Sequence, residues 1–523
     1  MACFLSYKKM EDASMSGNNA ILAMYDVRGI QSYIFKTNKV REIMGASFIV
    51  RDIIMDGIRK WISKKDQSKY LWDWQNSNTC RFLDDESIEM EVLFIGGGNA
   101  YVLFRNEKLC KEANRYLARY VLDQTYSLNL AVAYVEKTDN YMDDYKAIQD
   151  RMREIKATMP STKPMGTFPF MAWDSVTGQP ITETMTYGDG TSEWLCTESY
   201  LKTKRAKKEE IEKTEFDEMV TEKGDSSFLA LVHIDGNNMG MRIRELVEKK
   251  ASYEDAVPTM RKLSSNIANG FKECYDVMEK KAEQWTKKEP FNKGDKKSLL
   301  REIVLAGDDI TFVCNAKIAL SLVQTFLKET VHHYLDEEKK NAFSACAGMA
   351  YFNSHYPFSD AYEVAEACCS SAKAQAKLPI HQEDKMVGCY LDYQICTHIS
   401  SIHLSDYREK HYVDVNGNKI LARPYYVAVD HFEKLNEVNQ ERSIDQFLDA
   451  LHFFTNPENI ARSKAKNLRN AYAFGEDEVE QYKHFLRSRK IQLPYENEKC
   501  WYDALEMMDL ILLEEEDEYG KEE

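Results

Sequence analysis

The sequence predicts an α+β fold with two tandem ferredoxin-like domains and a helical C-terminal part. Three observations support this prediction: an internal repeat, a hairpin with acidic residues at its tip, and helical periodicity between residues 443 and 489. Each copy of the repeat reads strand, helix, strand, hairpin strand, helix, strand, helix. That order is the split β-α-β plan of ferredoxin-like domains.

The repeat is visible in the spacing of its landmarks. In the first copy a strand ends at Asp26, and a glycine-rich hairpin follows 72 residues later at Gly98. In the second copy a strand ends at Asp235, and a hairpin follows 73 residues later at Asp308. The next helix of each copy carries a tyrosine and a lysine with equal separation, Tyr145 with Lys156 and Tyr362 with Lys373. Two copies of one domain are indicated. A first copy that is kept only for packing is the alternative to one with a role in the site.

The most informative string is VLAGDDITFVC, in which Gly307, Asp308 and Asp309 lie between two apolar runs. Adjacent acids at the tip of a hairpin repel each other unless cations lie between them. Asp235 ends a buried strand, and beside this hairpin it would complete a site for two divalent cations. Ligands that are all oxygen favour Mg²⁺ or Mn²⁺. Such a site performs phosphoryl or nucleotidyl transfer, whereas an isolated GDD is usually a solvated turn.

The residues after Asp235 predict a nucleotide site. Gly236, Asn237 and Asn238 form a turn that leads into a helix, where backbone N–H groups can bind a triphosphate. The alternative is an ordinary helix N-cap formed by Asp235 or Asn238.

The first copy has Gly98 and Asn99 where the second has its two acids. This copy is therefore not expected to hold two metal ions. With Gly97, these residues are expected to bind nucleotide or to complete the site of the second copy, because glycine lets a ligand approach the backbone closely. A tight glycine turn without a ligand is the alternative.

Several motifs resemble the large polymerase-cyclase subunit of type III CRISPR effector complexes, which has tandem palm domains, and more distantly the GGDEF cyclases. The motifs are DVRGIQSYIF, REIMGAS, IGGGNAYVLF, FPFMAWDSVTGQP, HIDGNNMG, AGDD and SSAKAQAK. In that family the acidic palm domain converts ATP into cyclic oligoadenylate when the complex senses foreign RNA. The resemblance implies that Asp235 and Asp308 are metal ligands, that Asp309 is a ligand or a near neighbour, and that Lys373 contacts the triphosphate. Gly307 would lie beside the nucleotide.

The chain also departs from this family. It contains no His-Asp dipeptide, so the HD nuclease activity of many members is not expected. It contains no CxxC motif, so no zinc site is expected. Ala306 replaces the first glycine of the familiar GGDD motif.

Composition describes an ordinary globular protein, with 44% hydrophobic and 29% charged residues in 523. Twelve cysteines without a disulfide framework favour reduced thiols and a cytoplasmic location, and no apolar run is long enough to predict a membrane span. A net charge of -16 argues against broad nonspecific binding of nucleic acid. The basic string at residues 202–208 is expected to form a solvated helix or linker.

We expect a degenerate first palm domain at residues 1–160, a connector at 161–226, a second palm domain at 227–400, and a hairpin with a helical domain at 401–523. The leading functional prediction is an ATP-dependent nucleotide cyclase that uses two Mg²⁺ or Mn²⁺ ions. The alternatives are a subunit that assembles with CRISPR effector subunits and RNA, and a nucleotide sensor without turnover. Homo-oligomer formation is also open.

Overall fold

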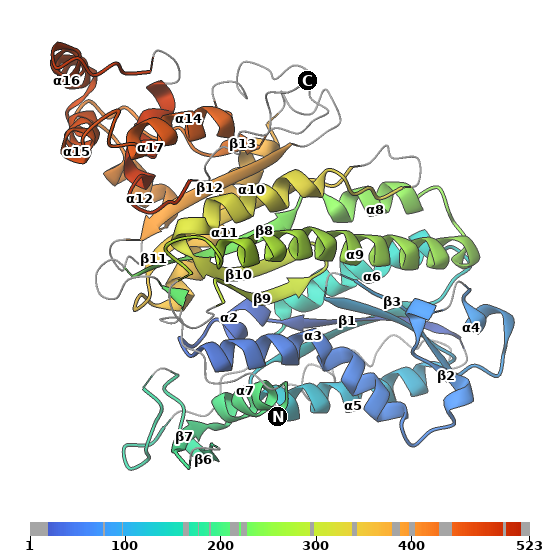
Figure 1. Cartoon of the computed structure of the whole chain (residues 1–523). Helices are drawn as coiled ribbons and strands as arrows, with labels where there is room; N and C mark the ends of the chain where they lie inside the picture. The colour runs from blue at the N-terminus through green and yellow to red at the C-terminus, as the bar shows by residue number, and fades with distance from the viewer. Residues whose placement is uncertain are drawn as a thin grey trace. The chain divides into compact units, whose positions relative to one another are not determined.

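The computed structural model describes residues 19–76, 79–96, 98–160, 167–175, 177–187, 190–209, 219–220, 227–292, 298–336, 342–378, 388–396, 403–427, 442–494 and 498–513. The chain divides into two compact units (Figure 1). Unit 1 contains residues 1–214 and 238–269, and unit 2 contains residues 215–237 and 270–523. The predicted fold class, two ferredoxin-like domains with a helical C-terminal region, is confirmed.

The described part of unit 1 holds a five-stranded sheet with the order β2-β3-β4-β1-β5. Its last four members follow the ferredoxin-like order, and β1 lies antiparallel to both β4 and β5. The strands are β1 (Ile21–Arg28), β2 (Tyr70–Leu71), β3 (Met90–Gly96), β4 (Asn99–Phe104) and β5 (Asn129–Glu136). The helices are α2 (Ile30–Ile34), α3 (Val40–Ile62), α4 (Arg81–Asp84), α5 (Glu107–Thr125) and α6 (Tyr141–Thr158).

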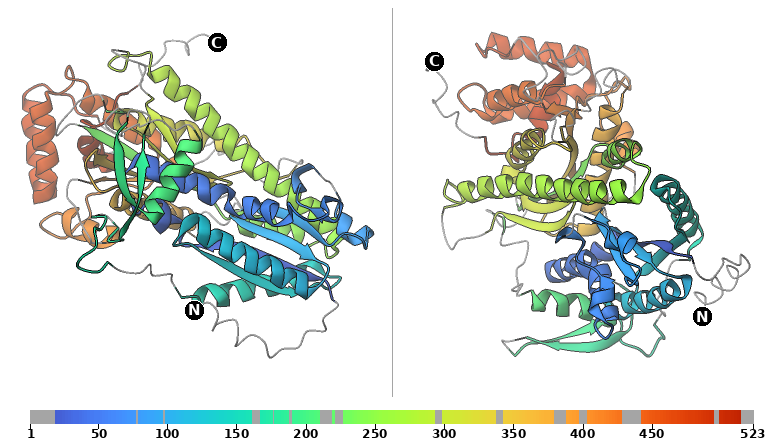
Figure 2. Two further views of the ribbon diagram at one scale, coloured as in Figure 1. Left: turned by 90° about the horizontal axis from the view of Figure 1, so that it is seen from below. Right: turned by 90° about the vertical axis from the view of Figure 1, so that its right-hand side faces the viewer.

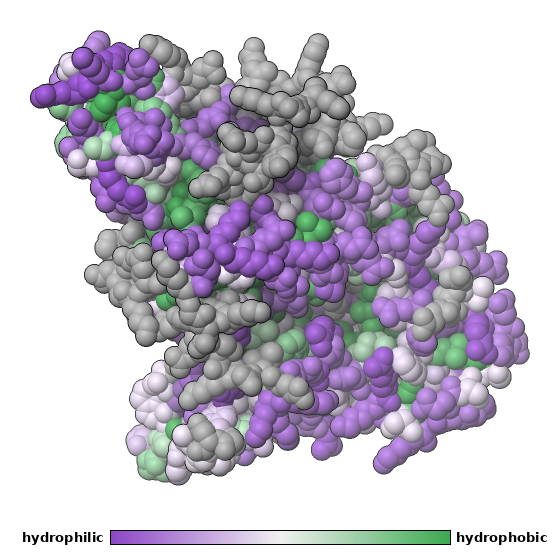
Figure 3. All heavy atoms as spheres, viewed as in Figure 1, coloured by the Kyte–Doolittle hydropathy of each residue, from purple (hydrophilic) through white to green (hydrophobic). Residues whose placement is uncertain are grey.

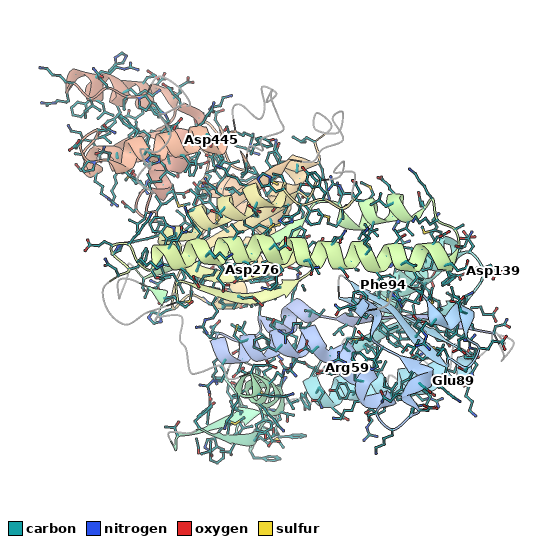
Figure 4. All side chains as sticks on the ribbon, turned by 45° about the vertical axis from the view of Figure 1, so that its right-hand side comes forward. Arg59, Glu89, Phe94, Asp139, Asp276 and Asp445 are labelled. Carbon is teal, nitrogen blue, oxygen red and sulfur yellow. The ribbon has the colours of Figure 1, made fainter. Side chains whose placement is uncertain are left out.

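Aromatic side chains form a continuous row in unit 1. Phe94 on β3, labelled in Figure 4, stacks on Tyr101 with ring centroids 4.6 Å apart. Tyr101 in turn stacks on Tyr145 of α6 at 5.8 Å. The row therefore joins the hairpin β3–β4 to the helix that carries Lys156.

The connector between the repeats contributes β6 (Ile181–Thr186), β7 (Ser192–Cys196) and α7 (Thr197–Lys208). Helix α3 packs against both α5 and α7 (Figure 2). The expectation of a solvated basic segment is wrong for Lys202, whose side chain is buried. Its ammonium group donates to Glu198 Oε1 at 2.8 Å and to the Tyr33 carbonyl oxygen at 2.7 Å. Gly45 allows α3 to approach α7 closely, because a methyl group on Gly45 would overlap the Lys202 carbonyl oxygen.

In unit 2 the described strands form a six-stranded sheet with the order β13-β12-β11-β8-β10-β9. The four strands from β11 to β9 repeat the ferredoxin-like order of the first copy. The strands are β8 (Phe228–Gly236), β9 (Leu300–Ala306), β10 (Asp309–Asn315), β11 (Ala345–Asn353), β12 (Cys389–Cys396) and β13 (Tyr425–Val427). The helices of the second copy are α8 (Met239–Val247), α9 (Tyr253–Trp285), α10 (Ala319–Thr330) and α11 (Phe358–Ala376).

Helix α9 contributes to the cores of both units. In its first half, Arg261 is buried in unit 1, where it pairs with Glu91 at 2.8 Å and donates to the Leu93 carbonyl. In its second half, Tyr275 packs edge-on against Phe312 of β10 in unit 2. Asp276, labelled in Figure 4, belongs to this second half.

Helix α11 lies against β11 through small residues. Strand β11 reads ACAGMAYFN, and a methyl group on Gly348 would overlap the Ala365 carbonyl oxygen and the Cys369 nitrogen of α11. This absence of a side chain sets how closely the helix packs on the sheet. The place of Lys373 relative to the sheet therefore depends on Gly348.

The C-terminal region is helical, as the periodicity predicted, and Asp445 in Figure 4 marks the start of α14. Its helices are α12 (Leu404–His411), α14 (Ile444–Thr455), α15 (Arg462–Ala471), α16 (Glu476–Ser488) and α17 (Trp501–Met507). The face shown in Figure 3 is predominantly hydrophilic. None of the helices in the described ranges has the length and apolar character needed to cross a bilayer.

Candidate nucleotidyl-transfer site

Two strands of unit 2 bring carboxylates together. Asp235 near the end of β8 and Asp309 at the start of β10 are direct partners in the antiparallel register. Asp308 lies in the turn between β9 and β10, where its carbonyl oxygen accepts from the Gly236 amide at 3.1 Å. Gly307 adopts a φ of 67° in this turn, a conformation that glycine takes without strain. The three acids predicted from the sequence therefore occur at one end of the sheet.

These carboxylates disfavour one another's ionised forms. Burial, followed by the charge of Asp235, raises the pKa of Asp308 to about 6. Burial and the charges of Asp235 and Asp308 raise the pKa of Asp309 to about 7. Both shifts mean that the site holds more negative charge than its surroundings stabilise, which is the condition that a bound cation relieves.

Lys373 provides one positive charge at this site. It belongs to α11, and its Nζ forms an ion pair with Asp235 Oδ2. Burial acts to lower the pKa of Lys373, but the hydrogen bond and charge of Asp235 outweigh burial and raise it. Lys373 therefore lies beside the acids, and its expected contact with the triphosphate stays a prediction.

The acids can be compared with what a divalent ion requires of its ligands. Across the described ranges, no group of three or more His, Cys, Asp and Glu side chains is already arranged as a metal-binding cluster. However, Asp309 Oδ1 is buried without a hydrogen-bond partner, and the carboxylates and carbonyls here offer only oxygen donors. This chemistry fits Mg²⁺ or Mn²⁺. Asp235 would join such a site once Lys373 releases its oxygen.

The backbone amides of the turn after β8 make hydrogen bonds within the protein. The Gly236 amide donates to the Asp308 carbonyl, and the Asn237 amide donates to the Ser344 carbonyl at 2.8 Å. The Asn237 side chain donates to the Gly388 carbonyl at 3.3 Å. Asn238 has a φ of 55° before α8 and makes no side-chain cap. In this conformation the Gly236 and Asn237 amides are engaged within the protein.

Sequence reasoning missed a polar group beside Asp309. His233 and Thr311 are cross-strand partners on β8 and β10, and His233 Nδ1 lies 3.1 Å from Thr311 Oγ1. The imidazole packs edge-on against Tyr362 of α11 with centroids 5.7 Å apart. Burial lowers the pKa of His233 to about 4. The charge of Asp235 acts in the opposite direction, and the charge of Lys373 adds to the lowering. The sequence could have indicated this neighbour, because His233 lies two positions before Asp235 and so shares its face of the strand.

Glu366 is a fourth acid that sequence reasoning missed. It lies on α11 one turn after Tyr362 and two turns before Lys373, which places it on the same face of the helix. Burial, then the charges of Glu363 and Asp235, raise its pKa. Its charge also raises the pKa of Asp309.

The first copy repeats the lysine–aspartate pair without the other acids. Lys156 of α6 forms an ion pair with Asp26 of β1. Gly98 lies in the β3–β4 turn with a φ of 75°, and Asn99 begins β4. Gln149 stands where the helical spacing puts Glu366 in the second copy, and its amide donates to the Tyr101 hydroxyl. The predicted residue Gly97 lies outside the described residues.

The two copies consequently differ in charge. The second copy brings four carboxylates to one ammonium group, whereas the first brings one of each. The first site is neutral without a metal ion. Only the second has an excess of negative charge to be balanced by cations.

The fold and this acidic hairpin define a protein with tandem palm domains, of which the second carries the acidic site. Residues 228–379 match the family model of the Cas10/Cmr2 second palm domain. The resemblance to the polymerase-cyclase subunit of type III CRISPR complexes is thus confirmed for this part of the chain. No curated protein matches the chain in sequence.

Solved structures share the fold across nearly the whole chain. The Csm1–Csm4 subcomplex of the type III-A CRISPR-Csm interference complex matches with a TM-score of 0.51 and 11% identity, over 95% of this chain and 71% of that chain. A Csm1–Csm4 cassette in complex with pppApA matches with a TM-score of 0.50 and 11% identity, over 95% and 69% respectively.

Proposed function

We propose that the chain is a two-metal nucleotidyltransferase that converts ATP into a cyclic oligoadenylate second messenger in antiviral defence. The observation that carries this proposal is the direct pairing of Asp235 with Asp309, inside the segment that matches the Cas10/Cmr2 second palm domain. The similar Csm1–Csm4 structure with pppApA adds support. That compound is the linear dimer that results when two ATP molecules join with loss of pyrophosphate.

Asp235, Asp308 and Asp309 would hold two Mg²⁺ or Mn²⁺ ions. Bound there, the pair would activate the attacking 3′-hydroxyl and neutralise the pyrophosphate that leaves. The raised pKa values of Asp308 and Asp309 support this assignment, because cation binding would favour their ionised forms.

Lys373 would bind the triphosphate. Its ammonium group now neutralises Asp235, and cations on Asp235 would release it toward the phosphate oxygens. Gly307 presents no side chain. Apart from its two chain neighbours, no described residue has an atom within 4 Å of the place where its Cβ would be, so a nucleotide can approach the turn. Asn237, Asn238 and Gly236 complete the proposed nucleotide-binding segment.

The first copy would bind nucleotide without metal ions. Gly98 has open space around its missing side chain, and Asn99 offers an amide where Asp309 stands in the second copy. Gly97 belongs to the same proposed segment. The neutral Asp26–Lys156 pair supports the proposal that this copy binds nucleotide without metal ions.

A second candidate function is assembly or nucleotide sensing within an RNA-guided CRISPR effector complex, with little or no turnover. The observation that favours it is the match to Csm1 in a subcomplex with Csm4. Under either function, the proposed partners are CRISPR effector subunits and RNA.

The test is incubation of the purified protein with labelled ATP and Mg²⁺ or Mn²⁺, with and without cellular RNA, with products identified by mass spectrometry. We expect a cyclic oligoadenylate that is lost in Asp308→Ala and Asp309→Ala variants of unchanged thermal stability. An unchanged rate in both variants would overturn the metal assignment. No product under any condition would favour the assembly or sensing function, and copurification with RNA and small subunits would then be decisive.

A further inference from the structure

A buried imidazole lies beside the one Asp309 oxygen that lacks a partner. His233 is 5% exposed, and its Nδ1 is 3.1 Å from Thr311 Oγ1 and 3.6 Å from Asp309 Oδ1. No described residue makes a hydrogen bond to that Asp309 oxygen. The imidazole therefore lies beside a carboxylate oxygen that the protein leaves unsatisfied.

The local structure holds the imidazole in place. His233 shares a face of β8 with Asp235, and Thr311 shares a face of β10 with Asp309, because alternate strand residues point the same way. The Tyr362 ring packs edge-on against the imidazole at an interplanar angle of 71°. Packing on one side and the Thr311 hydroxyl on another restrict the directions in which Nδ1 can point.

The first copy provides an internal comparison. Met24 and Tyr101 are cross-strand partners there, in the same register as His233 and Thr311. Asn99 stands in place of Asp309. The helical tyrosine is kept, but it makes a different contact: Tyr145 stacks on Tyr101, at the Thr311 position, whereas Tyr362 packs edge-on against His233. The fold of the repeat therefore does not itself require the imidazole or the threonine hydroxyl, and both are absent where the acid is absent.

We infer that His233 is a positioning residue for Asp309: its Nδ1–H is directed at Asp309 Oδ1 and fixes the carboxylate in the orientation that binds a divalent cation. Thr311 Oγ1 is the second acceptor that holds the imidazole in its plane. This inference rests on the proposed function, because it takes Asp309 as a metal ligand. Outer groups that orient metal ligands are worth about 10- to 100-fold in metal affinity.

The test measures Mn²⁺ affinity by electron paramagnetic resonance on the full chain without nucleotide. His233→Met introduces the residue that the first copy carries at this position, and we expect Mn²⁺ to bind about 10- to 100-fold more weakly. His233→Asn keeps an N–H near the place of Nδ1 and is expected to retain most of the affinity. His233→Gln puts its N–H near the place of Nε2 instead and is expected to behave like His233→Met. Met24→Leu is the matched control and should leave Mn²⁺ binding unchanged.

The pattern across variants decides the outcome. Weak binding in the Met and Gln variants with retention in the Asn variant supports the inference. The comparison of Asn with Gln suffices if the Met variant is unstable, because both are polar amides. Equal affinities in Asn and Gln variants would overturn the inference. Asp309→Asn separates a failure of the metal assignment from a failure of the inference about His233. If Asp309→Asn loses Mn²⁺ while His233→Met does not, only the inference fails. If Asp309→Asn binds Mn²⁺ normally, the metal assignment fails and the inference fails with it.

Discussion

Lys373 Nζ forms an ion pair with Asp235 Oδ2 and so occupies an oxygen that a divalent cation would need. The first copy makes the same contact between Lys156 and Asp26. The shared pair is thus a property of the repeated fold, and the extra acids are specific to the second copy. In the second copy the ammonium group would compete with the proposed metal ion for Asp235.

Lys373→Met is expected to change two affinities in opposite directions. Mn²⁺ should bind several-fold more tightly without nucleotide, because a competing cation has been removed from Asp235. The KM for ATP should rise by roughly 10- to 100-fold, as expected when a charged contact to phosphate is lost. Electron paramagnetic resonance and steady-state kinetics measure the two effects.

Lys156→Met is the matched control, since Lys156 makes the corresponding ion pair where no acidic hairpin is present. It should leave the Mn²⁺ affinity unchanged. If Lys373→Met weakens Mn²⁺ binding instead, the ammonium group supports the metal site and does not compete with it.

The raised pKa values of Asp308 and Asp309 predict how stability depends on pH. Both carboxyls have a folded-state pKa above the ordinary value of 3.8, at about 6 and about 7. The folded state then binds more protons than the unfolded state, so stability is lost as the pH rises from about 4 to about 7. In EDTA the melting temperature should fall by a few degrees across this range.

Divalent cations should reverse this loss, because they stabilise the ionised carboxylates. The increase in melting temperature on adding Mg²⁺ should be larger at about pH 8 than at about pH 5. Asp309→Asn should flatten the pH dependence in EDTA. A melting temperature in EDTA that rises across the range would show that these carboxyls do not dominate the pH dependence.

The strands and the acidic turn could be predicted because their signals are local. Apolar runs and a glycine define the hairpin β9–β10, and the matching spacing of the repeat places Asp235 beside it. The ferredoxin-like strand order follows from the order of elements along the chain. These features require no knowledge of which side chains meet across the sheet.

Partners across the sheet were harder to predict. His233 reads as part of an apolar strand, and only the register with β10 shows that it meets Thr311. Glu366 lies in a helix rich in small residues, and only the docking of α11 brings its charge close enough to raise the pKa of Asp309. Lys202 was predicted to be exposed because a run of basic residues usually faces solvent. Its pairing with Glu198 and its close approach to Gly45 become visible only in the folded structure.

A buried charge network connects the second sheet to the C-terminal helices. Arg423 is fully buried and donates to Asp503 at 3.1 Å and to Glu506 at 2.7 Å, while its Nε lies 3.8 Å from Asp392 of β12. Arg423→Met should lower the free energy of unfolding by about 3–5 kcal/mol, because it leaves buried carboxylates without their partner. Urea denaturation measures the loss.

Arg462→Met provides the comparison, since Arg462 also pairs with an aspartate, Asp509, but is exposed. Its cost should be about 0–1 kcal/mol. Equal costs for the two variants would mean that the Arg423 network is no more important to stability than a surface ion pair.

Gly348→Ala tests whether the packing of α11 sets the position of Lys373. The added methyl group would overlap the Ala365 carbonyl oxygen and the Cys369 nitrogen, which are backbone atoms of α11 and cannot rotate away. The helix must shift or the sheet must distort, so we expect a loss of about 1–3 kcal/mol in stability together with a higher KM for ATP. Gly240→Ala is the control, because no described atom outside the adjacent backbone of α8 lies within 4 Å of the new methyl group, and alanine favours a helix such as α8. It should be neutral or slightly stabilising. If Gly348→Ala is destabilised but keeps the wild-type KM, then α11 adjusts without moving Lys373, and the lysine is held by its ion pair with Asp235 and not by the packing of the helix.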